Sequence, residues 1–224
     1  VRSKLAVSLD GRTALANGTS KWITSAAARA DVHRWRARSS AVLTGSGTIV
    51  DDDPSLDARR EEAQIPESIG IKQPLRVVID ARLKMPPSAK TLSLPGEVLV
   101  LTTLALDDAK AEALRAAGAR VERVAGDAEH CDLRAVIEHL GALEINDVWV
   151  EAGAGLNGAL LAAGLIDELI IYMAPRVLGS AARGMFDVPA LASLADATAV
   201  TFDDVSKVGA DLRITARVSR VARA

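Results

Sequence analysis

The sequence of 224 residues is poor in the features on which specialised proteins depend. It contains one cysteine, Cys131, which excludes a disulfide framework and a zinc site built on several thiolates. Aromatic residues make up only 3%, so the core must be built from Ala, Val, Leu and Ile. No apolar run approaches the roughly 20 residues needed to cross a bilayer, and we expect no membrane partner. The lone cysteine also fits a cytoplasmic protein.

The sequence also lacks an excess of either positive or negative charge. The chain has 27 Lys and Arg against 29 Asp and Glu, a net charge of −2, whereas a general nucleic-acid binder usually shows a basic excess. The 49% apolar and 25% charged fractions are those of an ordinary globular protein, which excludes disorder, collagen and coiled coil. The three histidines show no metal-ligand spacing, so we expect no metal and regard them as surface or capping residues (His33, His130 and His139).

Length alone allows one large domain or two small ones, on a prior of about 150 residues per domain. The chain shows no internal repeat, low-complexity segment or linker, so we expect a single domain over residues 1–224. It starts with Val1 rather than Met and opens almost directly into strand-like sequence, which suggests a piece of a longer chain.

Short apolar runs alternate with helical stretches, a pattern typical of an α/β protein. We expect a mixed, mostly parallel sheet flanked by helices with an antiparallel edge at the C-terminal end, where residues 201–205 and 212–218 alternate apolar and polar positions. The other predicted strands cover residues 4–9, 41–44, 75–80, 97–103, 120–124, 147–151 and 168–174, with 12–16 as a possible hairpin arm. The predicted helices cover 26–38, 107–117, 133–140 and 156–163; residues 59–73 are expected to form a surface loop.

The sharpest local motif is the run Gly153-Ala154-Gly155-Leu156-Asn157-Gly158. It matches GxGxxG, follows an apolar strand and opens a helix, the context that dinucleotide binding requires. Glycines let a backbone approach a pyrophosphate, and free N–H groups at a helix start attract its charge. The motif lies two-thirds along the chain, and the next strand ends in Pro175-Arg176 rather than an acid, so a standard Rossmann domain is disfavoured. A tight strand-to-helix turn without a ligand remains the alternative.

Several charged residues are candidates for a site. Glu151 ends an apolar strand just ahead of the glycine turn, and ligands of open α/β sheets bind at the carboxyl ends of strands. In the run Asp51-Asp52-Asp53, one carboxylate could bind a ligand, although solvation or turn capping is the simpler interpretation. Arginines crowd the helix 26–38, as a solvated face or as an anion site; Arg34 and Arg38 share a face and Arg36 points elsewhere. Lys4 lies either at a strand edge or toward a pocket.

A resemblance to a known family rests on residues 4–56, which include SLDG, SKWITS and DDDPSL, and on LRVVID (75–80), WVEAGAGLNGALLAAGLIDELIIYMAP (149–175) and VLGSAARG (177–184). In this order, these segments resemble the reductase domain of the bacterial bifunctional riboflavin-biosynthesis deaminase/reductase. The resemblance implies a dihydrofolate-reductase-like fold, in which a late glycine turn holds NADPH. It implies NADPH-dependent reduction of the ribosyl group of 5-amino-6-(5-phosphoribosylamino)uracil to the ribityl form, and a homodimer. The zinc signature of the deaminase half, HxE…PCxxC, has no match here, so the N-terminal deaminase domain is expected to be absent from this chain.

The resemblance also implies site residues. Those expected to contact NADPH are Ala6, Trp22, Thr48, Asp52 and the turn Gly153, Ala154, Gly155, Leu156, Asn157, Gly158 and Ala159. Those expected to contact the substrate are Ser20, Arg36, Leu56, Arg59 and Glu151, with the arginines near its 5′-phosphate. The candidates for proton delivery, or for stabilising a cationic imine, are Glu151, Asp52 and Lys4.

Three other functions remain open at this point. One is a related reductase on the same fold that acts on a pterin or another pyrimidine, which would not need arginines facing a phosphate. Another is a non-catalytic domain that binds NADPH without consuming it. A Rossmann dehydrogenase is disfavoured by the position of the glycine motif.

Overall fold

The computed structural model describes residues 1–219, which divide into two compact units, residues 1–31 with 152–219 and residues 32–151. A single domain over the whole chain stays a prediction. Most expected elements are present. The strands are β1 (Arg2–Ser8), β2 (Arg12–Ala14), β3 (Ala41–Gly45), β4 (Leu75–Ile79), β5 (Val98–Thr102), β6 (Arg120–Arg123), β7 (Val148–Val150), β8 (Glu168–Ala174), β9 (Arg183–Gly184), β10 (Val200–Val208) and β11 (Asp211–Val218). The helices are α1 (Ala26–Arg38), α2 (Ser46–Asp52), α3 (Arg60–Ala63), α4 (Lys90–Ser93), α5 (Ala109–Ala116), α6 (Leu133–Ala142), α7 (Ala154–Ala162) and the 3₁₀ turn η1 (Leu194–Asp196).

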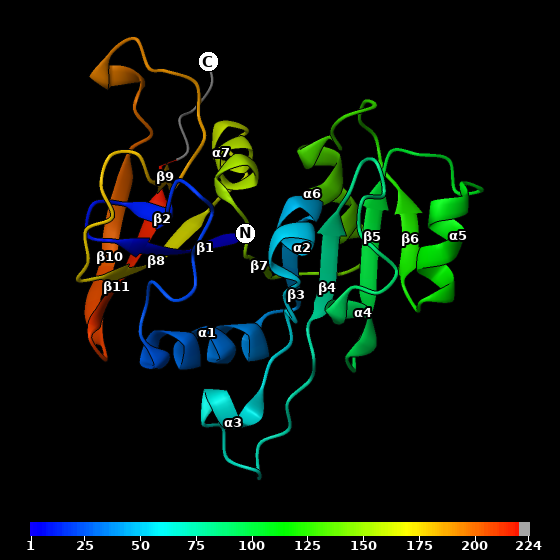
Figure 1. Ribbon diagram of the computed structural model, residues 1–224, viewed down its shortest axis with the longest axis horizontal. Helices are drawn as coiled ribbons and strands as arrows, with labels where there is room; N and C mark the ends of the chain where they lie inside the picture. Colours follow the sequence, from blue (N-terminus) through cyan, green and yellow to red (C-terminus); the bar gives the residue numbers. More distant parts are fainter. Residues whose placement is uncertain (220–224) are drawn as a thin grey trace. The chain divides into compact units, whose positions relative to one another are not determined.

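The unit of residues 32–151 contains a parallel sheet in the order β7, β3, β4, β5, β6. Strands β4, β5 and β6 run side by side in Figure 1. Because both faces of a parallel sheet are covered, its inner strands are mostly apolar: every residue of β5 and of β7 is buried, whereas the edge strand β6 buries only Val121. All its strands point the same way, so their carboxyl ends lie along one edge.

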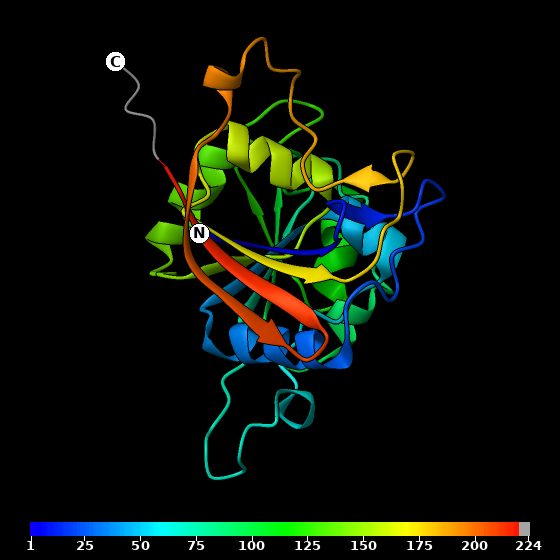
Figure 2. The same cartoon turned by 90° about the vertical axis from the view of Figure 1, so that its left-hand side faces the viewer.

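The unit of residues 1–31 and 152–219 has strands in the order β10, β11, β8, β1. Strands β1 and β8 are parallel, whereas β11 pairs antiparallel with both β8 and β10, which confirms the expected C-terminal edge. Figures 1 and 2 show α7 on one side of these strands and the beginning of α1 on the other. Hydrogen bonds support both placements: Ser3 Oγ donates to Asn157 Oδ1 of α7 at 2.7 Å, and the Tyr172 hydroxyl donates to Asp31 Oδ2 of α1 at 2.7 Å.

Three expectations about local structure were wrong. Strand β2 does not fold back as a hairpin arm on β1; it pairs with β9, far away in the sequence. Helix α6 does not end at Gly141 but includes it and runs to Ala142, because a glycine with helical dihedral angles does not stop a helix. The expected loop 59–73 contains the short helix α3.

The glycines of α7 differ in their surroundings. A Cβ built on Gly158 would lie 2.0 Å from the backbone oxygen of Asp187, so the helix and the chain at Asp187 approach closer than any side chain allows. A Cβ on Gly155 would meet no atom within 4 Å. One glycine of the motif is therefore needed for packing, and the other lies against open space.

This difference gives a matched pair of variants. Gly158→Ala is expected to lower the free energy of unfolding by about 1–3 kcal/mol, because backbone must shift to admit the methyl group. Gly155→Ala, in the same helix, is expected to be neutral or to stabilise by up to about 1 kcal/mol through helix propensity. Urea unfolding of both variants measures this; equal effects would contradict the packing role of Gly158.

Candidate active site

Glu151 lies at the carboxyl end of β7. Its amide donates to the Leu43 carbonyl at 2.9 Å, which extends the β3–β7 pairing by one residue. The strand ahead of it is fully buried, so the chain leaves the core at Glu151. The Glu151 carboxylate thus lies at the edge where ligands of parallel sheets bind.

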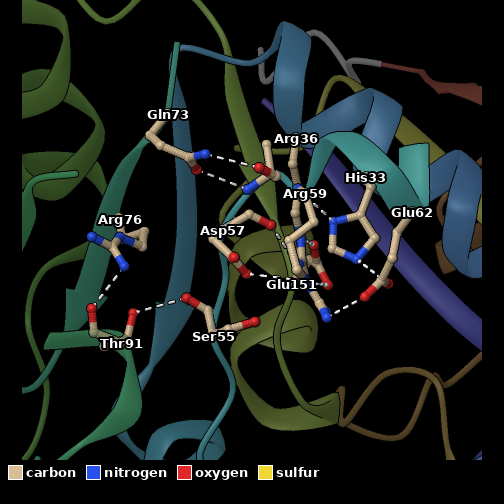
Figure 3. A network of polar contacts seen from close by, with 11 residues as sticks. His33, Arg36, Ser55, Asp57, Arg59, Glu62, Gln73, Arg76, Thr91 and Glu151 are labelled. Atoms are coloured by element: carbon tan, nitrogen blue, oxygen red, sulfur yellow. Dashed lines mark hydrogen bonds and ion pairs between the residues drawn. The ribbon is translucent and has the colours of Figure 1, made fainter. Parts of the chain in front are cut away.

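A buried ion pair holds this carboxylate. Arg36, on α1, donates from Nε to Glu151 Oε1 at 2.5 Å and from Nη2 to Oε2 at 3.0 Å, a two-point contact seen in Figure 3. The Trp149 indole Nε1 adds a third hydrogen bond to Oε1 at 2.9 Å. The side chains of Arg36 and Glu151 are only 10% and 12% exposed. Burial alone would lower the pKa of the Arg36 guanidinium, but the charge and hydrogen bonds of Glu151 outweigh it and the pKa is raised.

Two tryptophans and an arginine stack next to this ion pair. The Trp149 and Trp35 rings stack with centroids 5.2 Å apart and planes 9° from parallel. The Arg38 guanidinium lies 4.2 Å from the Trp35 ring centroid. Trp35 and Arg36 are neighbours on α1, so the same helix that supplies the guanidinium also packs on the strand that supplies the carboxylate.

The loop of residues 53–59 is tied to this pair. The third nitrogen of Arg36, Nη1, donates to the Asp57 carbonyl at 3.0 Å. The Gln73 amide holds the next residue at two points, accepting from the Ala58 N–H at 2.9 Å and donating to its carbonyl at 2.8 Å. Figure 3 shows these two hydrogen bonds as dashed lines from the Gln73 amide. A side-chain amide thus replaces the pairing that a neighbouring strand would provide.

A second buried arginine anchors the other end of the loop. Arg76 of β4 is 1% exposed and donates to the carbonyls of Thr91, Leu94, Pro95 and Gly96, which satisfies the end of α4. Burial lowers the pKa of Arg76. The Thr91 hydroxyl in turn donates to the Ser55 carbonyl at 3.2 Å. Leu56 follows with φ of +55°, a left-handed conformation that needs such anchoring on both sides.

Arg59 is the accessible cation of the loop. Its side chain is 48% exposed and forms ion pairs with Glu62 and, at 3.5 Å, with Asp57. Burial opposes ionisation of Asp57, but a hydrogen bond from Ser55 and the charge of Arg59 lower its pKa. Arg59 can therefore meet a ligand from solvent, whereas Arg36 is enclosed.

His33 is the residue that the sequence reasoning placed wrongly. It is neither on the surface nor a helix cap: it is 4% exposed and lies one turn before Arg36 on α1. Nδ1 accepts a hydrogen bond from the Arg59 amide at 3.2 Å, and Nε2 lies 2.9 Å from Glu62 Oε2. Burial lowers its pKa, and the charges of Arg36 and Arg59 lower it further. The spacing of three residues from Arg36 was the signal available in the sequence, because such residues share a helix face.

The glycine turn begins α7. Gly153 and Gly155 are exposed, and a Cβ on either would meet no atom within 4 Å. Asn157 is turned inward: its side chain is buried and bonded to Ser3 and, at 2.8 Å, to the Ala152 carbonyl. The open glycines fit the close approach of a phosphate to the helix start, so the residues present suit a nucleotide cofactor. The Asn157 side chain serves the fold.

The remaining predicted residues occupy both units. Lys4 and Ala6 are half-buried on β1, Ser20 is half-buried, and the exposed Trp22 ring lies 4.5 Å from the Arg29 guanidinium. Thr48 and Asp52 belong to α2, the short helix that follows β3. The structure brings Arg36, Arg59 and Glu151 into one connected network through Asp57, and Leu56, which precedes Asp57 in the loop, is 1% exposed. The residues of that network that sequence reasoning missed are His33, Gln73, Arg76 and Trp149.

Other chemistry is not supported by the described residues. Cys131 is a free, buried thiol whose pKa is raised to about 11, first by burial and then by the charges of Asp80 and Asp127. Over residues 1–219, no group of three or more His, Cys, Asp or Glu side chains is placed to hold a metal ion. Within the same residues, no helix combines the length and apolar character that a membrane crossing requires.

Comparisons with known proteins agree with this architecture. Residues 1–214 match the family model of the RibD C-terminal domain. The chain is 42% identical over 218 residues to the riboflavin biosynthesis protein RibD of Escherichia coli K12, covering 95% of this chain and 58% of the relative. It is 33% identical over 207 residues to a protein of Buchnera aphidicola named 5-amino-6-(5-phosphoribosylamino)uracil reductase, covering 88% of this chain and 96% of the relative. The structure of Acinetobacter baumannii RibD, form 1, superposes with a TM-score of 0.85 at 38% identity, over 98% of this chain and 58% of that one.

The fold and these matches define an α/β domain of the kind that RibD proteins contain over the matched part of their length. The chain belongs to the RibD C-terminal domain family, which confirms the resemblance found in the sequence. It spans 58% of the length of the RibD protein of Escherichia coli that it matches. A reductase of this family implies a nicotinamide cofactor.

The buried ion pair predicts strong coupling. Arg36→Met is expected to lower the free energy of unfolding by about 3–5 kcal/mol, because it leaves the Glu151 carboxylate buried without its guanidinium. Combined with Glu151→Gln, the loss should be smaller than the sum of the two single losses. Arg38→Met is the matched control on the same helix and should cost about 1 kcal/mol or less. Additive losses in urea unfolding would contradict the pairing.

The lowered pKa of His33 predicts a loss of stability in acid. Below its ordinary pKa of 6.5 the unfolded chain binds a proton that the folded chain rejects. The contribution of neutral His33 is therefore complete above pH 6.5 and is lost as the pH falls toward the folded pKa. Between pH 8 and 5, wild type should lose stability relative to His33→Asn, by up to about 1.4 kcal/mol per pH unit. A difference that stays constant over this range would contradict the assignment.

Proposed function

We propose that this chain reduces the ribosyl group of 5-amino-6-(5-phosphoribosylamino)uracil to the ribityl form with NADPH, a step of riboflavin biosynthesis. The carrying observation is the network at the carboxyl end of β7, where a fixed carboxylate, Glu151, is joined through Arg36 to a loop that presents the accessible Arg59. The Buchnera aphidicola relative, matched over 96% of its length, bears the name of this reductase.

The substrate carries a phosphate, and Arg59 is the cation placed to meet it. Its guanidinium is half-exposed, and guanidinium groups bind phosphate in a two-point fork. Arg36 uses Nε, Nη1 and Nη2 within the protein, so we assign it first to holding Glu151 and the Asp57 carbonyl, next to the substrate. Ser20, Leu56 and Glu151 complete the proposed substrate contacts.

NADPH is the proposed cofactor, and it supplies the hydride. The open start of α7, from Gly153 to Ala159, would hold its phosphates through backbone N–H groups and the helix dipole. Ala6, Trp22, Thr48 and Asp52 are the other proposed contacts. The protein supplies position and electrostatics rather than redox chemistry.

The reaction also needs a fixed negative charge and a proton. The ribose ring opens by breaking its C–O bond at the anomeric carbon, hydride adds to that carbon, and the ring oxygen gains a proton. Glu151 accepts three N–H hydrogen bonds, two of them within its ion pair with Arg36, and a proton on it would remove the charge that pairs with this guanidinium. We therefore assign Glu151 to stabilising positive charge on the substrate nitrogen, and proton delivery to Lys4 or Asp52.

We further propose that residues 1–224 act as one reductase domain in the cytoplasm, as a homodimer. The edge strand β10 supports the dimer, because Phe202 and Val205 are 65% and 54% exposed on it. Paired sheet edges are a common way to cover such strands.

The decisive experiment follows NADPH absorbance with purified protein. Oxidation of NADPH should depend on 5-amino-6-(5-phosphoribosylamino)uracil and should yield the ribityl product by mass spectrometry. Oxidation with a pterin in its place would favour a related reductase. Binding of NADPH without turnover on either compound would favour a non-catalytic domain.

Arg59→Ala tests the phosphate contact. It is expected to raise the KM for the substrate about 10- to 100-fold, because it removes a pair of charge-assisted hydrogen bonds to the phosphate. The KM for NADPH should stay within about twofold of wild type. Arg60→Ala is the matched control, because the Arg60 guanidinium caps the carbonyls of Pro66 and Ile69 instead. Equal effects of Arg59→Ala on both KM values would refute the phosphate assignment.

A further inference from the structure

His33 closes a ring of contacts around Arg59. The imidazole, on α1, is buried, yet both of its nitrogens have polar partners: the Arg59 amide at the end of the loop and the Glu62 carboxylate of α3. Figure 3 shows it between Arg59 and Glu62, on the side of Arg59 opposite to Asp57. Neither the proposed hydride transfer nor the proposed proton delivery uses it.

The contacts fix the tautomer of the imidazole. Nδ1 accepts the backbone N–H of Arg59, so Nδ1 carries no proton. In the neutral ring the proton is then on Nε2, which donates it to Glu62 Oε2 at 2.9 Å. The other oxygen of Glu62 accepts from the Arg59 guanidinium. One imidazole therefore fixes Arg59 twice, directly at its main chain and through Glu62 at its side chain.

The surroundings favour the neutral ring. The charged groups around it are Arg36 on its own helix, Arg59 and Glu62 from the loop and α3, and Glu151 after β7. A proton on Nδ1 would face the Arg59 N–H donor instead of accepting from it. Protonation would thus release the main chain of Arg59 as well as add a third cation beside two arginines.

We propose that His33 is a positioning residue for anion binding, and that its neutral imidazole holds Arg59 in the orientation that receives the substrate phosphate. The inference rests on the proposed function for the identity of the phosphate compound. It adds a residue that acts through another side chain and touches neither substrate nor cofactor.

The test compares three variants at pH 7.5. His33→Leu removes both contacts, His33→Asn keeps an acceptor near the position of Nδ1, and His33→Gln keeps a donor near Nε2. His33→Leu should raise the KM for the substrate about tenfold with kcat and the KM for NADPH within about twofold, since misplacing a binding group weakens the step that it serves. His33→Asn should restore most of the loss and His33→Gln less of it.

A binding measurement separates this inference from the proposed function. Calorimetric titration with ribose 5-phosphate needs no cofactor and no turnover, and ribose is the control without phosphate. Arg59→Ala and His33→Leu should each weaken binding of ribose 5-phosphate about tenfold, and the double variant should be no weaker than Arg59→Ala alone. If wild type binds this probe but does not oxidise NADPH with the uracil substrate, the proposed function fails and the inference on His33 stands.

Three outcomes would overturn the inference. In the first, the double variant loses affinity for ribose 5-phosphate by the product of the two single losses. In the second, His33→Leu binds this compound as wild type does, and in the third, His33→Asn does not bind it although its melting temperature is unchanged. If His33→Leu does not fold, His33→Gln takes its place, since it also leaves the Arg59 amide without an acceptor.

Discussion

The buried pair of Arg36 and Glu151 constrains every other part of the network at the strand ends. Two charges taken out of water are costly unless geometry is good and the remaining hydrogen-bonding groups are satisfied. Both conditions hold here, because the contact has two points and Trp149 supplies a third donor. The pair cannot shift without moving α1, the end of β7 and the Asp57 carbonyl together. A rigid charge at a sheet edge is the result, and the accessible loop is built outward from it.

The loop of residues 53–59 shows how irregular backbone can be made rigid. It has no strand neighbour, and Leu56 has a positive φ. Side chains replace the missing ladder: the Gln73 amide pairs with Ala58 as a strand would, and Arg76 orders the segment that holds Ser55. A binding residue on such a loop is positioned as firmly as one on a strand, which catalysis and tight binding both need. The exposed Arg59 therefore differs from an ordinary surface arginine, whose side chain would lose much entropy on binding.

Much of the fold could be predicted from the sequence, because its elements are set by local patterns. The apolar runs at 75–80 and 97–103 predicted buried strands of the parallel sheet, and the alternation of apolar and polar residues at 212–218 predicted the antiparallel edge. Helical spacing separated Arg36 from Arg34 and Arg38. What failed depended on tertiary contacts between distant segments: the pairing of β2 with β9, the burial of His33 and the roles of Gln73 and Arg76. A polar residue inside a helix pattern says nothing about its partner until the loop that covers it is known.

The glycine motif shows the same difference between what a local sequence pattern predicts and what tertiary contacts decide. Gly153 and Gly155 lie against open space, whereas the backbone of Asp187 occupies the space that a Cβ on Gly158 would need. In the Rossmann fold the first glycine of the motif forms the tight turn, the second lets the backbone approach the pyrophosphate and the third permits close packing. Here the motif follows a late strand and the fold is different, yet the last glycine again permits close packing. The motif therefore occurs at a helix start that packs closely against a neighbouring chain segment, and its spacing does not by itself specify the fold around it.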